Sequence, residues 1–272
     1  MTKAKASTAL AKQPQKAVAV PDSSLDDYAA HASGGLEQVT SSDLLIPRLV
    51  IIQSTSDEIK KSKPKFIAGA EVGDIADVGT KQVFKDEVLF LPVYYSKVWI
   101  EWAPRGSTQS LIAVHDNSAI MEQTKKSERN ENLLPNGNRV SETAQFFGLN
   151  LNAGRRPTFL PMASTQLKKA KYWCTLASNE RITREDGTEF TPPLWSRVYR
   201  LGVADESNAQ GDWKGWTVTP DLQSHEAAKK YSKVEWPKLR QEILGFLKSL
   251  QTGAAKADLA AMQADQPDPE VM

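Results

Sequence analysis

The sequence predicts a mainly β protein with helical additions, in which a small barrel or a curved antiparallel sheet forms the core. Several short runs of β-branched and aromatic residues lie between positions 87 and 219, which is typical of strands. Turn signals such as Asn136-Gly137 and Asp186-Gly187 separate these runs. Only two segments carry convincing helical signals, and no internal repeat is evident.

The first strand-like run extends from Glu87 to Tyr95. Its Pro92 indicates a sheet edge or a β-bulge, because proline has no amide hydrogen for the ladder. The run continues to Trp102, and Val98, Ile100 and Trp102 alternate with Lys97, Trp99 and Glu101 as in a half-buried strand. Further strands are predicted at Leu111–Val114, Thr158–Met162, Leu194–Val203 and Trp213–Thr219. The polar segment Asp116–Thr143 is expected to be a flexible loop.

Two helices are predicted in the second half of the chain. One begins with Ser164 or Thr165 as its N-cap. The other runs from about Glu235 to Gln251, where Pro237 is tolerated in the first turn. The second helix should pack one face on the sheet, because its apolar residues recur at helical spacing: Leu239, Ile243, Phe246, Leu247 and Leu250.

Both ends of the chain have compositions unsuited to a packed core, so a single domain is predicted over residues 41–250. Residues 1–40 are expected to form a disordered basic segment, since four lysines precede the first acid, Asp22. Residues 251–272 are expected to form a flexible acidic tail, with four acids against Lys256. Such a tail either recruits partner proteins or only increases solubility.

Composition excludes several classes of protein. The chain has 34 Lys+Arg, 33 Asp+Glu, three His and one Cys, and a single cysteine makes neither an internal disulfide nor a Cys-based zinc finger. No run approaches the ~20 apolar residues of a membrane span, and the N-terminus lacks the apolar core of a signal peptide. A cytoplasmic location is therefore predicted.

No catalytic motif is present, so a protein that is not an enzyme and needs no cofactor or metal is predicted. The histidines are scattered at His31, His115 and His225. His115 adjoins Asp116, but neighbours in a strand point to opposite faces, which disfavours a joint metal or catalytic site. Cys174 lies in a helical pattern and is interpreted as a packed core residue.

The most informative stretch lies between Glu142 and Glu180, which contains no acid. Its cations are Arg155, Arg156, Lys168, Lys169 and Lys171, and Tyr172 and Trp173 lie among them. Cations that follow a phosphate backbone, beside aromatic rings that stack on bases, are what a single-strand binder needs. The alternative is a solvated helix face whose aromatic residues lie in the core.

A second combination of aromatic and cationic residues occurs in the predicted strand at 194–203. Alternation places Trp195, Arg197 and Tyr199 on one face. These side chains either form a stacking surface or place their rings in the core with Arg197 at the rim. Lys214, which lies between Trp213 and Trp216, is a further cation next to aromatic residues. Because the chain has seven Trp and six Tyr, some of these rings are expected to be exposed.

Four segments together resemble a group of tailed-bacteriophage proteins that are taken to be single-stranded-DNA-binding proteins of replication or recombination. The segments are Asp43–Leu49, Phe66–Asp74, Pro92–Trp102 and Ser164–Lys169 with Trp173, and the likeness covers about Ser42 to Thr219. The resemblance implies an OB-like barrel, a viral origin, a location in the host cytoplasm and a role in DNA replication or recombination. The chain departs from the acidic, aromatic-capped tip of such proteins, because it ends Pro269-Glu270-Val271-Met272.

We therefore expect a protein that binds single-stranded DNA without strong sequence preference. Trp173, Trp195 and Tyr199 would stack on bases with Arg197 between them. The predicted phosphate contacts are Arg155, Arg156, Lys168, Lys169 and Lys171, and Lys214 is a further predicted DNA-binding residue. A protein-interaction or virion-assembly component is the first alternative. A metal-dependent nuclease with dispersed carboxylates is the second.

Overall fold

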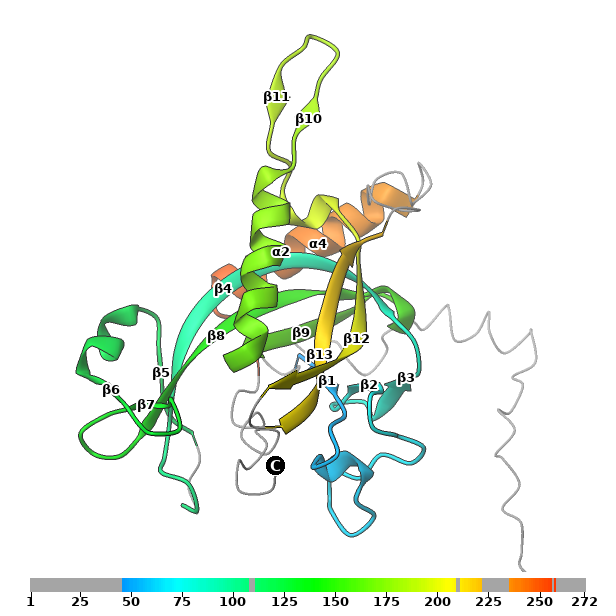
Figure 1. Ribbon diagram of the computed structural model, residues 1–272. Coiled ribbons are helices and arrows are strands. Elements are labelled where there is room, and N and C mark those ends of the chain that lie inside the picture. The colour runs from blue at the N-terminus through cyan, green and yellow to red at the C-terminus, as the bar shows by residue number, and fades with distance from the viewer. Residues whose placement is uncertain (1–45, 108–110, 209–210, 222–234, 256, 258–272) are drawn as a thin grey trace, which may run out of the picture. The chain divides into compact units, whose positions relative to one another are not determined.

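The computed structural model describes residues 46–107, 111–208, 211–221, 235–255 and 257 (Figure 1). Its main element is an eight-stranded antiparallel sheet built on two long strands, β4 (Val88–Trp102) and β8 (Arg139–Asn150). The order along the sheet is β13-β12-β4-β8-β7-β6, while β5 pairs with β4 and β9 pairs with β8. The remaining strands are β5 (Leu111–His115), β6 (Lys125–Lys126), β7 (Asn132–Leu133), β9 (Arg156–Ala163), β12 (Tyr199–Asn208) and β13 (Gly211–Pro220).

The sheet curls into a half-barrel, and the arch of β4 and β8 is visible in Figure 1. This confirms the predicted mainly β fold with a curved antiparallel sheet and few helices. The OB-type topology implied by the resemblance stays a prediction.

A β-bulge interrupts the pairing of β4 with β8 between Pro92 and Tyr94, as Pro92 predicted. The extra residue changes which alternate positions face each side of the sheet. Leu91 before the bulge and Val93 within it pack on one side of the sheet, and Val98, Ile100 and Trp102 after the bulge pack on the same side. The bulge therefore lets one continuous strand supply apolar residues to the same side of the sheet along its length.

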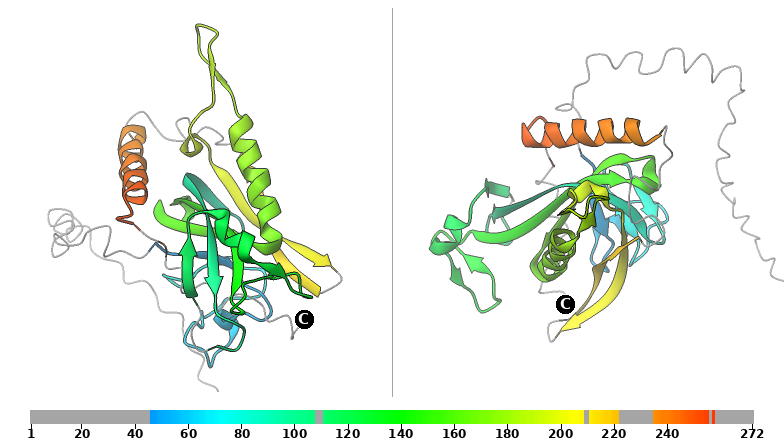
Figure 2. Two further views of the ribbon diagram at one scale, coloured as in Figure 1. Left: turned by 90° about the vertical axis from the view of Figure 1, so that its left-hand side faces the viewer. Right: turned by 90° about the horizontal axis from the view of Figure 1, so that it is seen from above.

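Two helices cover opposite sides of the sheet (Figure 2). Helix α2 (Leu167–Asn179) packs Ala170 and Trp173 into the largest core cluster. Helix α4 (Glu235–Gln251), whose bounds agree with the predicted helix, packs Leu239 and Ile243 against Leu91, Val93 and Leu149.

Smaller elements complete the described part of the chain. The strands β1 (Leu49–Ile51), β2 (Ile75–Asp77) and β3 (Gln82–Phe84) form a separate antiparallel sheet. A hairpin of β10 (Ile182–Thr183) and β11 (Glu189–Phe190) follows α2. The 3-10 helices are η1 (Asp57–Ile59), η2 (Ser118–Gln123), η3 (Leu151–Ala153), η4 (Ser164–Gln166) and η5 (Leu194–Ser196).

Three local predictions are wrong. The polar segment Asp116–Thr143 is not a plain loop, since it contains η2, β6, β7 and the start of β8. Residues 194–196 form η5, and β12 begins only at Tyr199. Neither Ser164 nor Thr165 is the N-cap of α2, because both lie in η4 and Gln166 occupies that position without a side-chain cap hydrogen bond. The predicted basic segment 1–40 lies outside the described residues, as does most of the predicted acidic tail.

Candidate nucleic-acid interface

The predicted interface centres on α2, which lies across one side of the curved sheet. Its inner face follows the helical period, with Leu167, Ala170, Trp173 and Cys174 in or against the main core cluster. Its outer face carries Lys168, Lys171, Tyr172 and Thr175, all of which are exposed. Positions three and four apart share one side of a helix, so these four residues form a continuous strip.

Trp173 lies in the core, so the prediction that its ring is exposed to bases is wrong. Its side chain has 0% exposure. The indole stacks on Phe146 with ring centroids 4.0 Å apart and contacts Phe90 and Tyr199 edge-on. Tyr199 is equally buried, and burial raises the pKa of its phenol to about 12. Neither ring offers a free face for a base.

Arg197 is also buried, with 5% exposure. Its Nε and one terminal nitrogen donate to Oε1 of Glu180 at 3.0 and 2.8 Å. This ion pair joins the end of α2 to the start of β12, so Arg197 acts in packing rather than as a surface cation between two rings.

Trp195 lies apart from Tyr199, contrary to the expected common strand face. It is half-buried in η5 and packs with Trp236 of α4, at a centroid distance of 6.3 Å. The strand pattern failed here because Pro193 precedes a 3-10 turn, which changes the direction of the side chains that alternation had aligned.

Four of the predicted DNA-binding cations already have acidic partners. Arg156 contacts Asp77 at 3.4 Å and Arg155 contacts Glu242 at 3.5 Å. Lys169 pairs with Glu206, and Lys214 pairs with Asp205. Phosphate binding by any of the four would have to compete with a carboxylate.

Glu206 is a polar junction that the sequence analysis missed. It accepts hydrogen bonds from Lys169, from Gln166 and, at 2.8 Å, from the indole Nε1 of Trp213. Burial opposes ionisation of Glu206, but the hydrogen bonds from Lys169 and Trp213 outweigh it and lower the pKa of this carboxyl. The junction fixes the first turn of α2 on β12 and β13, and it lies 37 residues from Lys169 in sequence, beyond any local motif.

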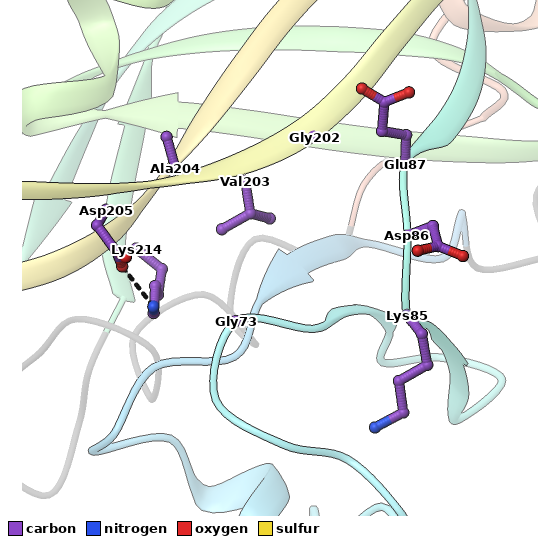
Figure 3. A pocket seen from close by; sticks show the side chains of 9 residues that line it. All are labelled: Gly73, Lys85, Asp86, Glu87, Gly202, Val203, Ala204, Asp205 and Lys214. Atoms are coloured by element: carbon purple, nitrogen blue, oxygen red, sulfur yellow. Dashed lines mark hydrogen bonds and ion pairs between the residues drawn. The ribbon is translucent and has the colours of Figure 1, made fainter.

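Lys214 borders a pocket of about 330 Å³ beside β12 (Figure 3). The pocket contains charges of both signs, and its lining comprises Gly73, Lys85, Asp86, Glu87, Gly202, Val203, Ala204, Asp205 and Lys214. In Figure 3 Lys214 points toward Asp205. Lys85 pairs with Asp74, and this hydrogen bond raises the pKa of its ammonium group. Three acids beside two lysines make this pocket unsuited to phosphate.

Lys168 and Lys171 remain available at the surface. Within the part of the chain that the structure describes, neither makes an ion pair, and the adjacent Tyr172 is 56% exposed. None of the seven tryptophans is exposed, so among the described aromatic residues the expected exposed ring is the phenol of Tyr172 and not an indole. Helical spacing from Lys168 to Tyr172 was the signal in the sequence that could have selected this residue in place of Trp173.

The histidine in β5 has a simple structural role. His115 Nε2 lies 2.9 Å from Glu101 Oε2, and Asn138 donates to the other oxygen of Glu101 at 2.5 Å. The Asn138 hydrogen bond is the main cause of the lowered pKa of the Glu101 carboxyl. Across the described ranges, no group of three or more His, Cys, Asp or Glu side chains is placed to hold a metal ion.

A family model described as Pam3 phage gp34-like protein matches residues 13–235. The chain belongs to this family. Membership in the Pam3 phage gp34-like family identifies it as a bacteriophage protein, in agreement with the viral origin implied by the resemblance.

The family match includes every strand of the described structure and α2, and it ends at the first residue of α4. No curated protein and no solved structure matches the chain. No helix among the described residues is both long enough and apolar enough to cross a membrane.

Proposed function

We propose that this phage protein binds single-stranded DNA, without strong sequence preference, along the outer face of α2 during replication or recombination. The observation that carries the proposal is the strip of Lys168, Lys171 and Tyr172, in which two lysines adjoin an exposed ring. No acid occurs between Glu142 and Glu180 in the sequence. Such a surface attracts the phosphates of a strand through the lysines and stacks a base on the phenol.

The proposed site is smaller than the sequence predicted. Trp173, Tyr199 and Arg197 are excluded because they are buried, and Trp195 because it packs with α4. Arg155, Arg156, Lys169 and Lys214 are secondary contacts, since each would first have to leave or share its carboxylate partner.

The test is the double substitution Lys168→Ala and Lys171→Ala. We expect weaker binding of fluorescent oligothymidine, measured by polarisation over a series of salt concentrations. Each lost phosphate contact reduces the slope of log affinity against log salt by about 0.7, so the expected reduction is about 1.4. Tyr172→Ala should weaken binding with little change in slope, since a ring carries no charge.

Lys61→Ala with Lys63→Ala is the matched control, because both side chains are exposed lysines outside α2. Equal salt slopes for the α2 variant and the wild type would reject this interface. A wild type that binds no oligothymidine would reject the function itself.

A second candidate function, assembly with another protein, is favoured by one observation at the edge strand β5. Ile112 and Val114 are 40% and 39% exposed there, and among the described strands β5 pairs only with β4. Exposed apolar residues on a sheet edge are typical of a protein contact. Failure of DNA binding by the wild type would make this candidate the better supported one.

A further inference from the structure

Three arginines from different segments line a pocket of about 450 Å³ at the end of the sheet opposite β12. They are Arg105 after β4, Arg129 between β6 and β7, and Arg139 at the start of β8. The turn residues Pro104 and Gly137 and the hairpin residues Ser127 and Leu133 contribute to the walls, together with Glu128 and Glu131. The volume lies in the range of small-molecule sites.

The charges of this arginine pocket are arranged around one carboxylate. Oε1 of Glu131 lies 2.8 Å from a terminal nitrogen of Arg105 and 3.6 Å from one of Arg139. Two guanidinium groups thus approach a single oxygen, and the complete lining has three positive groups against two negative ones. A second anion would therefore bind among arginine side chains that already lie close together.

Arg139 places a second positive charge close to Arg105. Its side chain is largely buried, and burial followed by the like charge of Arg105 lowers the pKa of its guanidinium, while Glu131 acts in the opposite direction. An arginine still keeps its proton in proteins, so both guanidinium groups stay charged. Glu131 supplies one negative charge between them, and a phosphate would supply a second.

We propose that the arginine pocket binds a phosphate group. Guanidinium groups match phosphate oxygens with paired hydrogen bonds, and the pocket has room for a phosphate with an attached group. The phosphate can come from a free anion or from the end of a DNA strand. The pocket involves none of the α2 residues, so the proposal does not depend on the function assigned to that helix.

Isothermal titration with pyrophosphate tests the proposal. We expect Arg105→Gln to weaken binding about tenfold, because one charge-assisted pair is lost. Glu131→Gln should bind pyrophosphate more tightly than the wild type, since it removes the anion that competes for Arg105 and Arg139. A purely structural role for the cluster predicts no such gain. Lys61→Gln, an exposed cation outside the pocket, is the control and should bind as the wild type does.

The source of the phosphate is distinguished with oligothymidines of about 12 nucleotides, within the span of known single-strand sites. A strand with a 5′-phosphate that binds more tightly than its 5′-hydroxyl form, with the difference lost in Arg105→Gln, identifies a DNA end. If pyrophosphate binds and the protein binds the two strands with equal affinity, the phosphate comes from a free anion.

The proposal is overturned if neither pyrophosphate nor the 5′-phosphate strand binds at millimolar concentration, or if Arg105→Gln binds as the wild type does. Arg105 is exposed at the pocket rim, so this variant should fold even if Glu131→Gln does not. Pyrophosphate binding by the Lys168→Ala, Lys171→Ala variant separates this result from failure of the α2 interface.

Discussion

Trp173 places its indole among side chains from β4, β8 and β12, and this insertion holds α2 on the sheet. The ring stacks on Phe146 and meets Phe90 and Tyr199 at their edges. Aromatic pairs of this geometry add to the free energy gained from burial alone. The outer face of α2 is therefore presented in a fixed position by a residue on its inner face.

Trp173→Ala should lower the free energy of unfolding by about 3–5 kcal/mol, because the cavity would have three aromatic neighbours and little means of collapse. Urea unfolding followed by circular dichroism measures the change. Trp173→Phe, which keeps one ring, should lose clearly less. A loss below about 1 kcal/mol for the alanine variant would mean that the indole is not a packing residue.

Single residues also show how far exposure could be predicted. The sequence indicated an aromatic and cationic helix correctly, but composition does not tell which of two adjacent aromatic residues, Tyr172 or Trp173, faces the core, and only the helical spacing separates them. The ion pairs could not be predicted from the sequence either, because their partners lie far apart along the chain. Arg156 meets Asp77 from 79 residues away, and Lys169 meets Glu206 from 37 residues away.

At the scale of elements, the bulge in β4 depends on a close approach of β8. Gly148 lies opposite Pro92 in the register. A Cβ at Gly148 would overlap the Leu91 carbonyl oxygen and the ring of Phe90. Only the absence of a side chain allows the two strands to pair at this point.

Gly148→Ala should therefore lower the free energy of unfolding by about 1–3 kcal/mol, the usual cost of overpacking. The matched control is Gly245→Ala in the middle of α4, where an added Cβ meets nothing within 4 Å. That variant should be more stable by about 0.5–1 kcal/mol, because alanine favours a helix. Thermal unfolding of both variants checks the two signs, and equal effects would refute the packing argument at Gly148.

Elements differ in how much of them the sequence revealed. The α4 helix was predictable because its apolar residues repeat over 17 residues, and Pro92 marked the bulge. The η5 turn was not predictable, since the alternating pattern of residues 194–203 fits one continuous strand as well as a turn followed by a strand. The short strands β6 and β7 have two residues each and form through pairing with their neighbours, a tertiary effect that no local pattern carries.

For the whole molecule, the main core contains two tyrosines that resist ionisation. Tyr95 and Tyr199 belong to or pack against the same cluster. Burial raises the pKa of each phenol to about 12, above the ordinary value of about 10. The two groups therefore link the stability of the domain to alkaline pH.

The sign follows from the protons bound by each state. Below about pH 10 both states keep the phenol protons, so the full stabilisation is present. Between about pH 10 and 12 the unfolded chain loses these protons before the folded protein does, and the free energy of unfolding decreases. Urea unfolding across this window should show the decrease, and Tyr199→Phe should make it shallower. A decrease of the same steepness in Tyr199→Phe would show that Tyr199 does not contribute.

The two helices close the sheet from both sides, with Trp173 under α2 and Leu239 and Ile243 under α4. A ligand on the outer strip of α2 would therefore contact charged and polar groups at the solvent-exposed surface, and the apolar core would stay buried. Because burial of apolar surface is what gives binding a large negative change in heat capacity, association of a nucleic acid strand there should have a small one. The binding free energy of such a complex would come from counterions released into the solvent and from stacking on the ring of Tyr172.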